Sequence, residues 1–175
     1  RAGIACGWWP FKPARIKTMQ RVWNIPDLPV YSLATYTKDS LNMNICTYVS
    51  AVSMQPKRYM VAVYHHTQSL HNVMRSKYFV LQLLGEQNIT LVNTLGRKSG
   101  HYYNKEHYLR SRHWLTTWHN YTILAHIAGA VELKKLWYKN AGDHMMVLCD
   151  VVRAQSFHAD VLTLAALRTS KIIRA

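Results

Sequence analysis

The chain has 175 residues and a mass of 20.3 kDa, which suits a single domain with a sizeable buried core. Apolar residues make up 49% and charged residues 17%, a balance that excludes a disordered chain, and no apolar run approaches the ~20 residues of a membrane span. With 22 Lys and Arg against 8 Asp and Glu, the net charge of +14 favours polyanionic partners such as nucleic acid, anionic lipid or a phosphate-bearing cofactor. The three cysteines form no CxxC pair, which argues against a disulfide scaffold and favours a reducing, cytoplasmic location.

The first 27 residues form a segment that we expect to be irregular. Residues 1–27 hold three prolines and four large aromatic side chains between basic residues, and no acid precedes Asp27. The apolar stretch is too short and too aromatic for a secretory signal. We therefore divide the chain into an N-terminal arm, residues 1–27, which packs on the domain or on a partner subunit, and a domain over residues 28–175.

Three segments that follow the arm have the composition of strands. Residues 29–37 are apolar and β-branched and end in a Lys-Asp-Ser turn. Residues 44–54 mix β-branched with small polar side chains, which would let another molecule approach the backbone closely. Residues 58–65 contain a continuous apolar run, typical of a strand that is buried on both faces.

Helices and strands then alternate only loosely. Thr67 is a candidate N-cap for a helix whose apolar side chains recur at i, i+3 and i+4, and residues 78–84 read as another buried strand. A second helix should begin at Glu86 and stop at Gly96, followed by a basic loop over 96–113 with a short helical piece. The remaining predicted elements are strands over 127–133 and 145–152 around a turn at 139–143, and a short helix over 162–167.

This pattern predicts a mainly β fold with a few helices. Many strands with two or three helices favour a barrel or sandwich over a doubly wound sheet. The chain has no GxGxxG and no GxxxxGK[ST], so neither a Rossmann nor a P-loop nucleotide site is indicated.

The segment His65-His66-Thr67-Gln68-Ser69, between a strand and an amphipathic helix, is the first candidate site. A helix N-terminus offers free backbone N–H groups and a positive dipole end to a phosphate, and Thr67 and Ser69 add hydroxyl donors. The alternative is plain helix capping by Thr67, with both histidines on the surface.

The second candidate is the strand from Asn44 to Ser50. A flat aromatic ring can lie against an extended backbone that hydrogen-bonds to its polar edge, and small side chains permit that approach. The alternative is an ordinary strand whose hydroxyl groups pair across the sheet.

The third candidate is Gly142-Asp143-His144, where a histidine at the start of a strand could act as an acid or base or orient a reductant. The alternative is a turn aspartate beside a surface histidine. Other chemistries have little support, because the sequence contains no HExxH, no GxSxG and no cluster of acids. We expect no metal site.

Five segments occur in an order and spacing that resemble the flavin reductase-like family, whose fold is the FMN-binding split barrel. The resemblance covers residues 28–175 and is more specific than any one of its pieces. The matching segments are PVYSLATYTKDS, NICTYVSAVSMQP, YMVAVYHHTQSLHNVMRSKYFVLQLL, LGRKSGHYYNK and AGDHMMVLCDVV.

The resemblance implies an FMN-binding homodimer with the flavin near the subunit interface and NAD(P)H as the reductant. His144 would lie near the flavin and the hydride donor as the catalytic residue. The residues that would flank the isoalloxazine ring are Asn44, Ile45, Cys46, Thr47, Tyr48 and Val49. The residues that would bind the phosphate, or close over it or over the pyridine nucleotide, are His66, Thr67, Ser69, Arg97, Lys98 and Ser99.

The chain departs from the family pattern at a few positions. Gln55 stands where an acid often precedes the proline, and Asn104 stands where an Asp often precedes the Lys. His65 and His66 replace residues that are often small or basic. These departures bear on donor preference and flavin affinity more than on the fold.

We therefore predict an FMN-dependent oxidoreductase that transfers electrons from NAD(P)H to a flavin or another acceptor. Two alternatives remain: a non-catalytic FMN-binding electron carrier, and a basic nucleic-acid-binding barrel whose 20 aromatic side chains stack on bases. The carrier would be yellow but would not oxidise NAD(P)H. The nucleic-acid-binding barrel would bind single strands in a salt-dependent manner and carry no chromophore.

Overall fold

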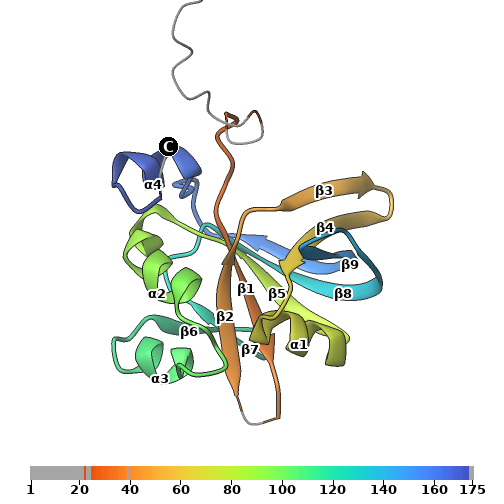
Figure 1. The fold of residues 1–175 in the computed structure, drawn as a ribbon, viewed down its shortest axis with the longest axis horizontal. Coiled ribbons are helices and arrows are strands. Elements are labelled where there is room, and N and C mark those ends of the chain that lie inside the picture. The colour runs from red at the N-terminus through yellow and green to blue at the C-terminus, as the bar shows by residue number, and fades with distance from the viewer. Residues whose placement is uncertain (1–21, 23–24, 39, 174–175) are drawn as a thin grey trace, which may run out of the picture.

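The structure, a computed structural model, describes residues 22, 25–38 and 40–173 (Figure 1). Most of the expected arm over residues 1–27 lies outside these described residues. Asp27, at the end of that segment, accepts a hydrogen bond of 2.7 Å from the backbone N–H of Ala165. None of the described helices is long and apolar enough to cross a membrane.

A seven-stranded antiparallel sheet with the order β2-β1-β5-β8-β9-β4-β3 forms the centre of the molecule. A separate two-stranded hairpin, β6–β7, packs beside it. No ladder pairs β2 with β3 in the described part of the chain, so hydrogen bonds do not close the barrel. The predicted mainly β fold with a few helices is confirmed. The strands are β1 (Tyr31–Tyr36), β2 (Leu41–Cys46), β3 (Val49–Met54), β4 (Lys57–Tyr64), β5 (Tyr78–Leu83), β6 (Leu115–Trp118), β7 (Tyr121–Leu124), β8 (Gly129–Asn140) and β9 (His144–Ser156).

The sheet separates two apolar cores, one on each face. Successive residues of β1 enter different cores, since Leu33 belongs to one cluster and Ala34 to the other. Phe79 and Val80 of β5 divide in the same way, and all four residues are fully buried. The continuous apolar runs of these strands are therefore explained by burial on both faces.

Different elements cover the two cores (Figure 1). Helix α1 covers one of them with Val73 and Leu70, next to β1 and β4. Side chains from the short helices and from the β6–β7 hairpin pack into the other. The helical elements are α1 (Gln68–Arg75), the 3₁₀ segment η2 (Glu86–Leu91), α2 (Val92–Arg97), α3 (Lys105–Arg110) and α4 (Leu164–Thr169).

Several predicted elements have different bounds in the structure. The strand expected over 44–54 is two strands, because β2 pairs with β1 and β3 pairs with β4 at the opposite end of the sheet, so the chain crosses over at Thr47 and Tyr48. The helix expected from Glu86 begins as the 3₁₀ segment η2 and continues as α2, which includes Gly96. The β6–β7 hairpin was not predicted.

Candidate functional site

The turn between β4 and α1 forms one wall of the candidate site. His66 has a φ of 61°, a left-handed conformation that is strained for a non-glycine residue and turns the chain from the strand into the helix. The Thr67 hydroxyl donates to the Tyr64 carbonyl at 2.8 Å and accepts from the Leu70 N–H at 3.1 Å. Thr67 therefore caps α1, and the N–H groups of Gln68 and Ser69, which lie in the first turn, have no carbonyl partner within the helix.

Ser69 is the hydroxyl group that remains available in this turn. Its side chain is 1% exposed, and its Oγ accepts a hydrogen bond of 2.9 Å from Asn42 Nδ2 on β2. The network continues behind Asn42, because Thr35 donates to the Asn42 carbonyl at 3.2 Å and Asn72 Nδ2 donates to Thr35 Oγ1 at 3.0 Å. With its acceptor position used by Asn42, the Ser69 hydroxyl can still donate its own proton.

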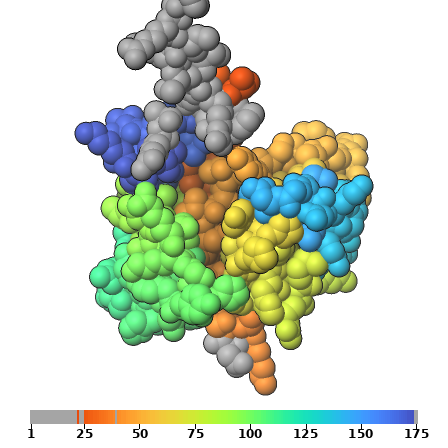
Figure 2. Space-filling view, in the orientation of Figure 1, coloured from red at the N-terminus to blue at the C-terminus, as the bar shows by residue number. Residues whose placement is uncertain are grey.

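A cavity of about 340 Å³ opens between β2, the start of α1 and the α2–α3 connection. Figure 2 shows the same arrangement from outside, with the orange surface of β2 exposed between the yellow β4–α1 region and the green region of α2 and α3. The family resemblance assigns a phosphate to several residues that line this space, so we call it the phosphate-side cavity. Its lining residues are Asn42, Asn44, Ile45, Tyr64, His66, Thr67, Gln68, Ser69, Leu95, Gly96, Arg97, Lys98, Ser99, Gly100 and Lys105.

The α2–α3 connection lies close to β2 because it contains Gly100. A Cβ atom at this position would overlap Asn42 Oδ1 and lie 3.0 Å from Gln68 Cβ, so any larger residue would force these neighbours to shift. Arg97 donates to the Ile172 carbonyl at 2.8 Å, and Lys98 Nζ lies 4.0 Å from the centre of the Tyr103 ring. Both cations are thereby held at the rim of the cavity.

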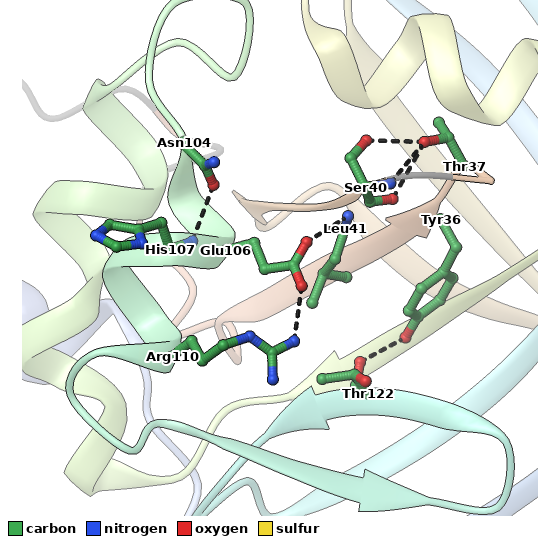
Figure 3. A network of polar contacts seen from close by, with 9 residues as sticks. All are labelled: Tyr36, Thr37, Ser40, Leu41, Asn104, Glu106, His107, Arg110 and Thr122. Carbon is green, nitrogen blue, oxygen red and sulfur yellow. Dashed lines mark hydrogen bonds and ion pairs between the residues drawn. The ribbon is translucent and has the colours of Figure 1, made fainter.

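Side chains of α3 fasten this helix to β2. Glu106 accepts hydrogen bonds from the Leu41 N–H at 3.0 Å and from Arg110 at 2.7 Å, and Asn104 caps the helix by accepting from the His107 N–H (Figure 3). Burial acts to raise the Glu106 pKa, but the hydrogen bonds from Arg110 and the Leu41 N–H, together with the charge of Arg110, lower it overall. The helix therefore holds one side of the cavity in a fixed place.

Lys105 is the most deeply buried charge at the cavity. It is 4% exposed, and its Nζ donates to the carbonyls of Met43 at 2.9 Å and Leu95 at 2.7 Å. Burial lowers the Lys105 pKa to about 8, because the charged form loses its hydration in the interior. The cavity is also lined by Asn44, whose Oδ1 atom is buried and has no hydrogen-bond partner.

Two further cavities adjoin the first. One of about 660 Å³ shares Ile45, Gly96 and Arg97 with the phosphate-side cavity. It also shares Thr47 and Tyr48 with a third cavity, of about 430 Å³, which includes Val49 and His144. The crossover residues Thr47 and Tyr48 thus line the second and third of a series of three neighbouring cavities.

His144 lies at the far end of this series, at the start of β9. Its ring makes edge-to-face contacts with Tyr48 and Tyr64, each with ring centroids 5.2 Å apart. Nδ1 lies 2.7 Å from Asp143 Oδ1. That hydrogen bond lowers the Asp143 pKa. The histidine is therefore held in one orientation by two rings and a carboxylate.

Of the twelve residues that the family resemblance assigns to the flavin, eight line the phosphate-side cavity, and Thr47, Tyr48 and Val49 line the two neighbouring cavities. Cys46 is the exception: its side chain belongs to the core cluster beneath α1, and burial raises the pKa of its thiol to about 12. The sequence analysis assigned no role to Asn42, Tyr64, Gly100 or Lys105, although the last three lie in segments that resemble the family. Alternation along β2 could have indicated Asn42, because it lies two residues before Asn44 and so on the same face. Among the described residues, no group of three metal-ligating side chains occurs.

Comparisons with solved structures show the fold. An FMN-binding protein from Thermus thermophilus has a TM-score of 0.68 and is 18% identical, with 89% of this chain and 80% of that chain covered. The flavin reductase of styrene monooxygenase from Pseudomonas putida S12 has a TM-score of 0.68 at 13% identity, covering 81% and 88%. BorF, the flavin reductase component of a bacterial two-component tryptophan halogenase, reaches 0.71 at 13% identity, covering 81% and 88%.

Sequence comparisons give the family. No curated protein matches the chain significantly. The family model described as "Flavin reductase like domain" matches residues 27–167, which is most of the chain. This protein therefore belongs to the family of flavin reductase like domains.

Proposed function

We propose that the protein binds FMN and transfers electrons from NAD(P)H to a flavin or another acceptor. One observation carries the proposal: residues 44–45, 66–69 and 97–99, which are far apart in the sequence, line one cavity. The solved structures with the same fold include FMN-binding proteins and flavin reductases, which supports the same class of cofactor here.

The residues of the phosphate-side cavity suit a flavin nucleotide. The described residues that line it include the cations Arg97, Lys98 and Lys105 and no carboxylate, as an anionic phosphate requires. The buried Asn44 Oδ1 lacks a donor, and a ribityl hydroxyl or a ring N–H would supply one. FMN offers an anion and such donors in one molecule.

Each part of the site would then have its own role. The free N–H groups of α1 and the Ser69 hydroxyl would bind the phosphate oxygens. The crossover at Thr47 and Tyr48 would hold the ring, and Tyr48 would also shield it from water. His144, oriented by Asp143, would lie where the nicotinamide donor approaches. The bound flavin supplies the hydride and electron chemistry, so no protein nucleophile is needed.

The outer face of the sheet supports a homodimer. Trp137, Leu148, Met60 and Ser50 are paired across β8, β9, β4 and β3, so their side chains share one face. The neighbouring pair Ala62 and Met146 lies on the same face, and Trp137 is 45% exposed. This apolar face borders the third cavity. A second copy that packs on it would place the flavin near the interface.

The test is a visible spectrum of the purified protein, followed by addition of NAD(P)H without air. We expect a yellow protein, or one that becomes yellow when FMN is added, and bleaching by NADH or NADPH. A protein that binds FMN but is not reduced would be a non-catalytic electron carrier. Protein that binds no FMN, does not oxidise NAD(P)H with flavin present and binds single-stranded nucleic acid would overturn the proposal. The cytoplasmic location stays a prediction from the cysteines.

A further inference from the structure

Residues 97–114, which include the α2–α3 connection and α3, form a basic and aromatic segment. They contain five Lys and Arg, three His, three Tyr and one Trp, but a single acid, Glu106. Glu106 points toward β2, where it accepts from the Leu41 N–H, whereas His107 points away from that strand (Figure 3). The outward side of the segment is therefore positively charged. Its exposed cations are Arg97, Lys98, Arg110 and Arg112.

Two tyrosine rings lie between two of these cations. Lys98 Nζ lies 4.0 Å from the centre of the Tyr103 ring, and Arg112 Cζ lies 4.4 Å from the centre of the Tyr108 ring. The two rings are neighbours, with centroids 6.1 Å apart. We call these four residues the cation–tyrosine row. The rings hold both cations in place at the surface, so an anion that binds there immobilises less of each side chain.

Tyr102 adds an aromatic surface next to Tyr103 in the chain. Its side chain is 95% exposed, the highest value for a large apolar side chain among the described residues. Its ring centroid lies 6.2 Å from that of His101. A ring in this position can take a flat partner on its free surface, and such a contact removes apolar area from water.

This combination of cations and rings suits single-stranded nucleic acid. The phosphates of a single strand are anionic, and its unpaired bases present flat faces that stack on aromatic side chains whatever the sequence. An acidic peptide would use the cations and leave the rings without a partner, and a duplex keeps its base faces inside its own stack. The net charge of +14 attracts any polyanion from a distance.

We propose that the outward side of residues 97–114 binds single-stranded nucleic acid, with phosphates on Arg110 and Arg112 and a base stacked on Tyr102. The inference does not depend on the flavin function. Neither Tyr102 nor Arg112 lines any of the three cavities described above. Lys98 marks the border of the two sites, because it belongs to the cation–tyrosine row and also lines the phosphate-side cavity.

The first test measures the fluorescence anisotropy of a labelled oligothymidine of about 12 nucleotides as protein is added. The double variant Tyr102→Ser/Arg112→Gln removes one ring and one cation from the surface. The matched control, Arg75→Gln/Tyr138→Ser, removes the same groups from the end of α1 and from β8, where both residues are exposed. We expect the dissociation constant to rise by about tenfold or more in the first variant and by about threefold or less in the control.

Equal losses in the two double variants would show attraction by net charge alone and would overturn the inference. The salt dependence gives a second readout of the same variants. Loss of Arg112 should reduce the slope of log affinity against log salt by about 0.7, the value for one phosphate contact to a single strand. FMN affinity should be the same in both variants and the wild type, and a protein that binds the oligonucleotide but no FMN would refute the flavin function alone.

Two measurements on the wild-type protein hold even if a variant does not fold. Ultraviolet cross-linking to an oligonucleotide that contains bromouracil, followed by mass spectrometry, should mark Tyr102 or Tyr103. Polyglutamate of the same charge, vesicles that contain phosphatidylserine and a DNA duplex should each compete poorly with the oligothymidine. Equal competition by any of them, cross-links only outside residues 97–114, or no binding of the oligothymidine would overturn the inference.

Discussion

Asn42 Nδ2 donates a hydrogen bond of 2.9 Å to Ser69 Oγ, which joins β2 to the first turn of α1 in the interior of the protein. Both side chains are almost fully buried. The bond fixes the distance between the strand that would flank the ring and the turn that would bind the phosphate. The predictions for Asn42 and Gly100 below depend on this hydrogen bond.

Replacement of Asn42 by alanine should weaken FMN binding. The change leaves the Ser69 hydroxyl without its donor, so we expect a loss of stability of about 1–3 kcal/mol and a fall in FMN affinity of about tenfold. Asn88→Ala is the matched control, because Asn88 is also fully buried and bonds to the Gly85 N–H and the Ala125 carbonyl, away from the cavities. Thermal unfolding and fluorescence titration measure the two effects. Similar affinity losses in both variants would show that Asn42 acts only through stability.

Gly100→Ala should displace the α2–α3 connection from β2. The new methyl group would overlap Asn42 Oδ1, so we expect destabilisation of about 1–3 kcal/mol and weaker FMN binding. Gly96→Ala is the contrasting variant for stability. Gly96 lies in α2, and a Cβ atom there would lie 3.5 Å from Ile45 Cγ1 on β2, which is an ordinary van der Waals contact. That variant should be neutral or more stable by up to about 1 kcal/mol. Denaturant unfolding of both variants checks this prediction, and equal stability in the two would contradict it.

His144→Ala should slow turnover and spare flavin binding. His144 lies in the third cavity, whereas the proposed phosphate donors line the first, so we expect kcat/KM for NAD(P)H to fall by about a hundredfold with little change in FMN affinity. His158→Ala removes an exposed histidine outside these cavities and should leave both quantities unchanged. Steady-state rates of NAD(P)H oxidation measure kcat/KM for both variants. Wild-type turnover in His144→Ala would remove the catalytic assignment.

The ligand-free protein should gain stability from Lys105 as the pH rises. The folded-state pKa, about 8, lies below the ordinary value of 10.5, so between these values the unfolded chain binds more protons and the folded state is favoured by higher pH. Relative to Lys105→Met, the wild type should gain about 2 to 3 kcal/mol at most between about pH 8 and pH 10. Urea unfolding of both proteins at a series of pH values measures the difference. A difference that stays constant with pH would show that the lysine titrates normally.

Leu148→Glu should separate the proposed dimer into monomers. The substitution places a charge in the middle of the apolar outer face, between Met60 and Trp137. Phe157→Glu is the control, because Phe157 is 42% exposed and lies beyond the end of β9. Light scattering after size-exclusion chromatography gives the mass of each variant. A monomeric wild type, or a dimeric Leu148→Glu, would contradict the proposed interface.

The sequence predicted the elements that carry a strong local pattern. Strands β1, β4 and β5 were found because each has an apolar run that its burial requires, and α1 was found because Thr67 caps it. The β6–β7 hairpin was missed because its turn, His119-Asn120, contains no glycine, although His119 has a φ of 50°.

The site was only partly predictable for a similar reason. Residues such as Ser69 and His144 lie in recognisable local motifs. Lys105 lies in a segment that resembles the family pattern, but its burial could not be predicted, because a lysine in a polar loop is expected to be exposed and only the packing of α3 on β2 buries it. Gly100 likewise shows its role only when Asn42 is placed against it.

The attachment of α3 to β2 has a consequence for the whole molecule. β2 is an edge strand, and its outward-facing Leu41 N–H and Met43 carbonyl are occupied by Glu106 and Lys105. A foreign strand that tried to extend the sheet there would find these groups already taken, so the same two side chains protect this edge against intermolecular β-pairing and aggregation. A variant that loses both side chains would leave the edge of β2 open to pairing with other molecules. It should form fibrils or precipitate before any loss of catalytic activity is measured.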